Sequence, residues 1–322
     1  MYRQIPLRYS NQVMNSIKAQ RNRSSTVSES YIFENKIGSG SHSNVYKAIG
    51  NNQSQDQVAV KHYFNTWSCE SLIANEIAIL KRLDHPNCAK FLDLFVTFNN
   101  DCYLILEYID GIDLFDKVKD EGNLSESISQ AIIHQILSGA QYLHDCHIVH
   151  RDLKPENLIY DNHRYNSKLN GHDPKVLDEP HFTIKIIDFA YSTIDDGNGI
   201  TGVYGSKGYM APEVVEEKIY NKAIDCWTIG LITYFILSGQ RLFNTNDYET
   251  LCNTPAILDS IFNETTWSLI SPDIKDFIRQ LLMVDPKERL TCQAALNHAW
   301  FNPKLQNYNA LNNDNNSAHL DL

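Results

Sequence analysis

Hydrophobic positions follow two different periods along the chain. Between residues 31 and 108, short runs of β-branched and aromatic residues alternate with glycine- and asparagine-containing turns, which predicts strands. The run Val58-Ala-Val60 and the run Tyr103–Tyr108 are examples. Within this part, residues 70–83 carry apolar side chains three and four positions apart, which predicts a single helix.

After residue 110 the apolar spacing is that of helices. Long stretches of this kind cover residues 125–146, 225–238, 272–284 and 291–299. A strand-rich part followed by a helical part predicts an α+β fold. The two ends of the chain, residues 1–30 and 302–322, lack such a period and are predicted to be tails, the first a disordered basic one and the second rich in asparagine.

Composition narrows the class of protein. The chain has 322 residues, of which 43% are hydrophobic, so it can form two lobes with a large core. Its formal net charge of -11 argues against a nucleic-acid binder. Its 7 cysteines include no CxxC pair, which indicates reduced thiols and a cytoplasmic location, with a nuclear one also compatible. The longest apolar run, residues 227–237, is too short to span a membrane.

The segment His150-Arg-Asp152-Leu-Lys154-Pro-Glu156-Asn157 carries the strongest chemical signal. Its aspartate could accept a proton from an attacking hydroxyl, while its asparagine and a second carboxylate could hold a divalent metal on a polyphosphate. The segment resembles the catalytic loop of eukaryotic protein kinases, and Lys154 is typical of the serine/threonine branch. The resemblance extends over residues 31–301.

This resemblance implies a bilobal fold. A small β-rich N-lobe with one main helix is expected over residues 31–109, and a larger, mostly helical C-lobe over residues 110–301. It also implies ATP as the phosphoryl donor, Mg²⁺ as the metal, and serine or threonine hydroxyls of protein substrates as acceptors. The expected catalytic residues are Asp152, Lys154 and Asn157.

The nucleotide site is expected in the strand-rich part. Lys61 ends an apolar strand and needs an anionic partner, and Glu76 of the predicted helix is expected to hold it. The turn after Ile37 matches the kinase glycine-rich loop at its first two glycines, with Ser43 in place of the third. By resemblance the nucleotide-binding residues are Ile37, Gly38, Gly40, Val45, Ala59, Lys61, Glu76, Glu107, Ile109, Asp113, Leu158 and Asp188.

The metal is expected between Asp188 and Asn157, because Mg²⁺ prefers oxygen ligands. Asp188 opens the triplet Asp-Phe-Ala, where the family has Asp-Phe-Gly. Alanine at position 190 is tolerated if its φ is negative and costs about 1–2 kcal/mol if φ must be positive. Since the chemistry needs the carboxylate and not the glycine, retained activity with altered switching is predicted.

The segment from Asp188 to Glu213 resembles a kinase activation segment. Thr201 matches a common phosphorylation site for an upstream activating kinase, although an unmodified loop residue is nearly as compatible. Ser206 is expected to help Lys154 seat the incoming hydroxyl. Glu213 is expected to pair with Arg289 inside the fold, and Asp225 to brace the catalytic loop.

Several stretches point to one kinase group. Residues 110–115, 262–267 and 276–286 resemble the calcium/calmodulin-dependent protein kinase group. Asp113 and Glu156 stand where that group binds an arginine three residues before the phosphoacceptor, which predicts an Arg-x-x-Ser/Thr preference. The tail after residue 301 contains Lys304 as its sole lysine or arginine, so no calmodulin-binding segment is evident. The long connection 161–182 is predicted to be a surface loop or partner site.

Two alternatives remain open. A nucleotide-binding pseudokinase scaffold is favoured by Ala190 and Ser43 but opposed by the intact catalytic and metal-binding residues. A small-molecule kinase of related fold is disfavoured because Ala211-Pro-Glu213 and the peptide-seating Lys154 are present.

Overall fold

The computed structural model describes residues 26–40, 43–53, 55–64, 70–97, 101–162 and 182–301. The chain divides into two compact units, residues 1–114 with 142–198, and residues 115–141 with 199–322. Strands dominate the first unit and helices the second, so the predicted α+β class is confirmed.

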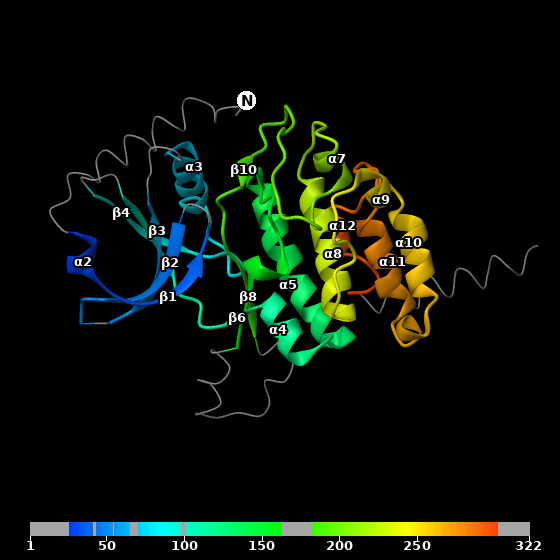
Figure 1. Ribbon diagram of the computed structural model, residues 1–322, viewed down its shortest axis with the longest axis horizontal. Helices are drawn as coiled ribbons and strands as arrows, with labels where there is room; N and C mark the ends of the chain where they lie inside the picture. The colour runs from blue at the N-terminus through cyan, green and yellow to red at the C-terminus, as the bar shows by residue number, and fades with distance from the viewer. Residues whose placement is uncertain are drawn as a thin grey trace, which may run out of the picture. The chain divides into compact units, whose positions relative to one another are not determined.

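The first unit is built on a five-stranded antiparallel sheet with the order β1-β2-β3-β5-β4 (Figure 1). Its strands are β1 (Tyr31–Ser39), β2 (Ser43–Gly50), β3 (Gln57–Tyr63), β4 (Phe91–Val96) and β5 (Cys102–Glu107). The helix predicted over residues 70–83 is α3 (Glu70–Leu80). In the centre of the sheet, Lys61 of β3 lies opposite Val45 of β2 and Leu104 of β5.

A short helix precedes the first strand. This helix, α2 (Val27–Ser30), has a capping box in which the Thr26 side chain accepts from the Glu29 backbone and the Glu29 side chain accepts from Thr26. Val27 is buried in a cluster with Ala48, Val58, Val60, Phe95 and Ile105. The described chain therefore begins before Tyr31, inside the segment predicted to be a tail.

Short strands complete the first unit. A three-stranded sheet joins β6 (Ile112–Asp113), β8 (Leu158–Asp161) and β9 (Thr183–Ile186), and a smaller pair joins β7 (Ile148–Val149) and β10 (Thr193–Ile194). The backbone after α3 binds β9: Ala89 N–H donates to the Ile186 carbonyl at 2.9 Å, and Ile186 N–H donates to Asn87 at 2.8 Å. These bonds join the helix-to-strand connection of the sheet to the strand that leads to Asp188.

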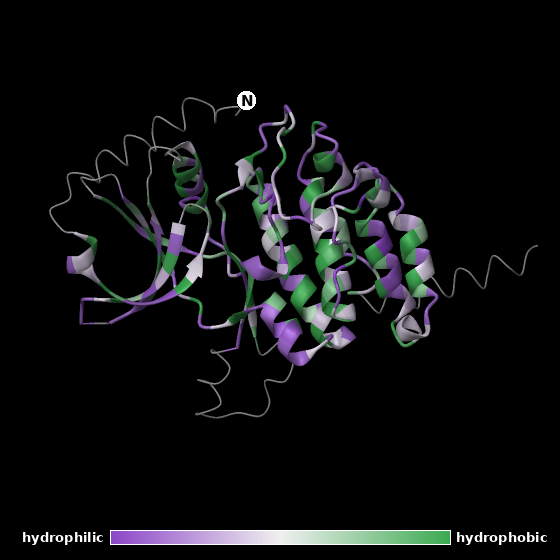
Figure 2. Cartoon of the chain, viewed as in Figure 1, coloured by the Kyte–Doolittle hydropathy of each residue, from purple (hydrophilic) through white to green (hydrophobic). Residues whose placement is uncertain are grey.

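The second unit is helical. Its elements are α4 (Leu114–Glu121), α5 (Glu126–Asp145, whose last turn belongs to the first unit), α7 (Pro212–Val215), α8 (Ala223–Ser238), α9 (Tyr248–Cys252), α10 (Thr254–Phe262), η3 (Thr265–Trp267), α11 (Pro272–Leu281) and α12 (Cys292–Leu296). Helix α8 is buried on all sides from Ile224 to Leu237. Helix α11 is amphipathic, with Ile274, Phe277, Ile278 and Leu281 buried and polar residues between them (Figure 2).

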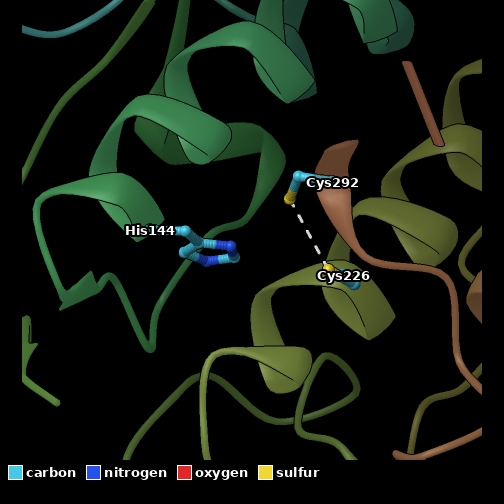
Figure 3. A group of neighbouring side chains, drawn as sticks. All are labelled: His144, Cys226 and Cys292. Carbon is cyan, nitrogen blue, oxygen red and sulfur yellow. Dashed lines mark hydrogen bonds between the residues drawn. The ribbon is translucent and has the colours of Figure 1, made fainter. Parts of the chain in front are cut away.

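Two cysteines meet in the core of the second unit. The sulfur atoms of Cys226, from α8, and Cys292, from α12, are 3.5 Å apart and share a hydrogen bond (Figure 3). This hydrogen bond and burial raise the pKa of the Cys292 thiol. All six cysteines of the described residues are free thiols. No helix within the described ranges is both long and apolar enough to cross a bilayer.

Candidate active site

The first feature of the site is a buried ion pair between strand β3 and helix α3. The ammonium of Lys61 lies 2.7 Å from the Glu76 Oε1 atom, and both residues are buried, at 6% and 1% exposure. A buried cation needs such a partner, because an unpaired charge inside a protein is costly. The predicted contact between these two residues is confirmed.

Asp188 supplies a second carboxylate to the same lysine. Its Oδ1 atom lies 2.8 Å from Lys61 Nζ, and its side chain is 44% exposed. Burial alone would raise the pKa of Asp188, but the ammonium of Lys61 lowers it to about 2. Burial alone would lower the pKa of Lys61, but Asp188 and Glu76 together raise it well above its ordinary value. Asp188 is therefore ionised at neutral pH and Lys61 is charged.

The catalytic-loop residues gather around Asp152. The Lys154 ammonium lies 3.2 Å from Asp152 Oδ2. The Asn157 amide nitrogen donates to the Asp152 carbonyl at 2.8 Å and lies 3.4 Å from Asp152 Oδ2. Because this nitrogen is engaged by the loop, the amide oxygen is the atom of Asn157 that can ligate a cation.

Strand pairing brings the metal-binding candidates together. Leu158 and Ile186 are register partners in the antiparallel pair of β8 and β9, and the Ile187 N–H donates to the Asn157 carbonyl at 3.0 Å. Asn157 directly precedes Leu158, and Asp188 lies two residues after Ile186, so both residues lie at the same end of this strand pair. The sequence predicted both residues, and the pairing of β8 with β9 brings the backbone of Asn157 to the residue that precedes Asp188.

The positive φ that would strain an alanine at position 190 is found two residues earlier, at Asp188. Among the described residues, the non-glycine positions with positive φ are Gln55, His147, Arg151, Asp188 and Glu217, and Asp188 has φ 60°. Ala190 is not one of them, so its side chain costs no strain in this conformation. Phe189 is buried at 1% exposure and packs edge-on against His150, with ring centroids 5.2 Å apart.

A protein kinase domain family model matches residues 31–301 of the chain. The chain belongs to the protein kinase family. It is 37% identical over 276 residues to calcium/calmodulin-dependent protein kinase type 1B of Rattus norvegicus, covering 85% of this chain and 76% of the relative. It is 35% identical to the type 1 enzymes of Macrobrachium nipponense and Caenorhabditis elegans, in each case covering 85% of this chain and 75% of the relative. The predicted resemblance to this group and the bilobal kinase fold are confirmed.

The other expected nucleotide-binding residues of the kinase lie on the strands of the first unit or next to them. Gly38 is in β1 and Gly40 directly follows that strand, and the Gly40 N–H donates to the Ser43 carbonyl at 2.8 Å. Ser43 starts β2 and is buried at 6% exposure. The remaining residues of this set are Ile37, which is exposed, Val45, Ala59, Glu107, Ile109, Asp113 and Leu158.

Glu107 has structural partners that the sequence did not suggest. Its Oε1 atom accepts from Lys185 at 2.6 Å and from the Lys90 backbone at 2.9 Å, and its own N–H donates to the Lys90 carbonyl at 2.9 Å. The side chain and the N–H of Glu107 therefore have partners within the protein, and the predicted contact with adenine would use its backbone carbonyl.

Sequence reasoning missed Tyr63. This residue ends β3, is 3% exposed, and its hydroxyl hydrogen-bonds to Glu76 Oε2. A tyrosine at the end of a strand is common, so its type alone gave no functional signal. Its position two residues after Lys61 was the available clue, because such residues share one face of a strand.

Three further predictions concern the second unit of the kinase. Arg289 binds both carboxylate oxygens of Glu213, at 2.7 and 3.0 Å, which confirms the predicted pair. Thr201 is exposed, and its phosphorylation stays a prediction, as do the roles of Ser206 and Asp225. Most of the 161–182 connection and the whole of the 302–322 tail lie outside the described residues.

Proposed function

We propose that this kinase transfers the γ-phosphoryl group of ATP to serine or threonine hydroxyls of proteins. The observation that carries the proposal is the position of the Lys61 ammonium, between the buried carboxylate of Glu76 and the part-exposed carboxylate of Asp188. One partner holds the lysine in place, while the other can be exchanged for phosphate oxygens. In kinases this lysine contacts the α- and β-phosphates.

The donor set of the site fits magnesium. Asp188 is ionised at neutral pH and lies two residues after the end of β9, and Asn157 directly precedes β8, the strand that pairs with β9. Carboxylate and amide oxygens are ligands that Mg²⁺ accepts together with phosphate. We propose that Asp188 and Asn157 hold the ion, which when bound neutralises charge on the β- and γ-phosphates.

Asp152 and Lys154 are proposed to act on the acceptor. The Asp152 carboxylate orients the hydroxyl and accepts its proton as the new O–P bond forms and the bond from the γ-phosphorus to the leaving ADP breaks. Lys154, 3.2 Å from that carboxylate, steadies the transferred group. The Asn157 nitrogen holds the Asp152 backbone, so the loop has a fixed geometry before substrate arrives.

We propose a preference for Arg-x-x-Ser/Thr sequences. Asp113 and Glu156, both half-buried, supply the acidic groups for the arginine. A positional peptide array tests this: arginine three residues before the acceptor should be selected, and a flat profile at that position would remove this part of the proposal.

The transfer itself is tested with labelled ATP, magnesium and an arginine-containing peptide. The wild-type chain should label the peptide, and Asp152→Asn, which keeps the shape of the side chain, should lower the rate about 10³-fold or more. Nucleotide binding without transfer by the wild type would instead support the pseudokinase alternative. Because the positive φ falls on Asp188 rather than on Ala190, the alanine gives that alternative no support.

The relatives are named for dependence on calcium and calmodulin. We propose that calmodulin does not act on this chain through residues 302–322, because this segment has Lys304 as its sole lysine or arginine. Calcium and calmodulin added to the assay should leave the rate of this chain unchanged.

We propose a cytoplasmic location for the kinase. We also propose Thr201 as the site of an upstream activating kinase.

A further inference from the structure

Tyr63 contacts both members of the Lys61–Glu76 pair. Its hydroxyl binds Glu76 Oε2, whereas the ammonium of Lys61 binds Glu76 Oε1. The Lys61 Nζ atom also lies 5.2 Å from the centroid of the Tyr63 ring, within the range of a cation–π contact. One strand, β3, therefore offers two donors to one carboxylate of α3.

We propose that Tyr63 is a positioning residue of this kinase. It holds Glu76 by its second oxygen, and so keeps α3 and Lys61 in place while Lys61 exchanges Asp188 for the phosphates of ATP. This inference rests on the proposed function, since it assigns a further residue to that site.

The hydrogen bonds of the Glu76 carboxylate support this role of Tyr63. Glu76 is 1% exposed, so each of its oxygens needs a partner inside the protein. When the Lys61 ammonium also donates to a phosphate of ATP, Glu76 Oε1 shares this donor with the phosphate. Glu76 Oε2 keeps its hydrogen bond from the Tyr63 hydroxyl. The second bond therefore protects a buried carboxylate at the moment when its first partner divides its hydrogen bonds.

The hydroxyl is a donor at every pH relevant to the enzyme. Burial and the neighbouring Glu76 carboxylate raise the pKa of Tyr63, an effect that outweighs the opposing influence of Lys61. The phenol thus stays protonated, and Glu76 accepts. A tyrosine in this state binds an ionised carboxylate without adding charge of its own.

A second anchor leaves from the neighbouring residue of α3. The side-chain amide of Asn75 donates to the Ser192 carbonyl, at 2.5 Å, in the segment that follows Asp188. Adjacent residues of one helix therefore bind β3 and the chain after Asp188. These contacts hold α3 within this unit, and they require no phosphorylated residue.

The test compares Tyr63→Phe with Tyr46→Phe. Tyr46 lies on β2 and packs against Phe33 at 5.7 Å, so its variant controls for loss of a sheet tyrosine hydroxyl. Tyr63→Phe should lower kcat about tenfold, the factor that corresponds to one hydrogen bond to a charged group, and leave KM for the peptide unchanged. Hydrogen exchange of the 70–80 backbone without nucleotide should become about fivefold faster, and Tyr46→Phe should change neither quantity.

A double mutant separates positioning from packing. In a Glu76→Gln background the partner charge is gone, so Tyr63→Phe should change kcat less than about twofold. Equal losses in both backgrounds, or wild-type kcat and helix exchange in Tyr63→Phe, would overturn the proposal. If the wild-type chain transfers no phosphoryl group, the proposed function fails, while the exchange of the helix backbone in the two tyrosine variants still decides whether Tyr63 holds α3.

Discussion

Each of the two units contains a buried cation that binds a carboxylate, and the two pairs are built differently. In the second unit, Arg289 binds both oxygens of Glu213 and also donates to the carbonyls of Met283, Ala223 and Val284, at 2.9, 3.0 and 3.2 Å. In the first unit, Lys61 divides its ammonium between Glu76 and Asp188, and the side chain of Asp188 is 44% exposed.

The difference separates a structural pair from a functional one. The planar guanidinium of Arg289 donates all its hydrogen bonds to atoms of the fold, so it has none left for a ligand. The ammonium of lysine is a compact charge whose partners can change. A buried cation with every donor committed stabilises the fold, whereas a buried cation with one part-exposed partner can serve chemistry.

Replacing Lys61 tests the functional side of this comparison. Lys61→Met should lower kcat/KM for peptide phosphorylation about 10³-fold, because the cation proposed to bind the α- and β-phosphates is lost. Circular dichroism should show the folded spectrum, and Lys36→Met, an exposed position on β1, should keep wild-type activity. Full activity in Lys61→Met would refute the proposed nucleotide site.

Replacing Arg289 tests the structural side. Arg289→Ala leaves the carboxylate of Glu213 buried without its cation, which should lower the free energy of unfolding by about 3–5 kcal/mol. Arg279→Ala is the matched control, because Arg279 pairs with Asp259 at 3.0 Å on the surface, with side chains 40% and 66% exposed. Such a pair should contribute about 0–1 kcal/mol. Urea unfolding measures both, and equal losses would contradict the distinction.

Both pairs could be predicted from the sequence, because each member lies in a motif of fixed spacing. The second partner of Glu76, Tyr63, could not. The role of Tyr63 becomes visible only when β3 and α3 are seen in contact, because the local sequence pattern does not predict which strand and helix residues pack together. Val27 was missed for a similar reason: it is one apolar residue among serines, and its burial depends on the Ala48–Phe95 cluster that covers it.

Backbone dihedral angles were a further limit. The sequence showed an alanine where the family has glycine, and this raised the question of strain at position 190. The structure places the positive φ at Asp188, two residues earlier. Residue type constrains φ but does not assign it, so the location of the strain needed coordinates.

Restoring the glycine tests whether Ala190 affects catalysis in this conformation. Ala190→Gly relieves no positive φ and makes the unfolded chain more flexible, so it should cost about 0.5–1 kcal/mol of stability. Activity should stay within about twofold of wild type, because the Asp188 carboxylate is unchanged. Thermal unfolding and the peptide assay measure the two effects, and a large gain in kcat would mean that the alanine restrains the site.

The smallest expected effect is the pH dependence of the Lys61–Asp188 contact. The pKa of Asp188 is lowered from 3.8 to about 2 in the folded protein, so its contribution to stability is fully present above pH 3.8 and is lost as the pH falls toward 2. The contribution is modest because the Asp188 side chain is 44% exposed and solvent screens the pair.

Melting temperatures of wild type and Asp188→Asn should differ by a constant amount from pH 7 to pH 5, and the difference should shrink below pH 4. In Tyr46→Phe, which changes no charged group, the difference from wild type should not show this shrinkage at the same pH. If the melting temperature of wild type exceeded that of Asp188→Asn by a growing amount on acidification, the sign would be wrong for a carboxylate whose pKa is lowered by the lysine. The interpretation that Lys61 binds Asp188 as a partner it can exchange for phosphate would then fail.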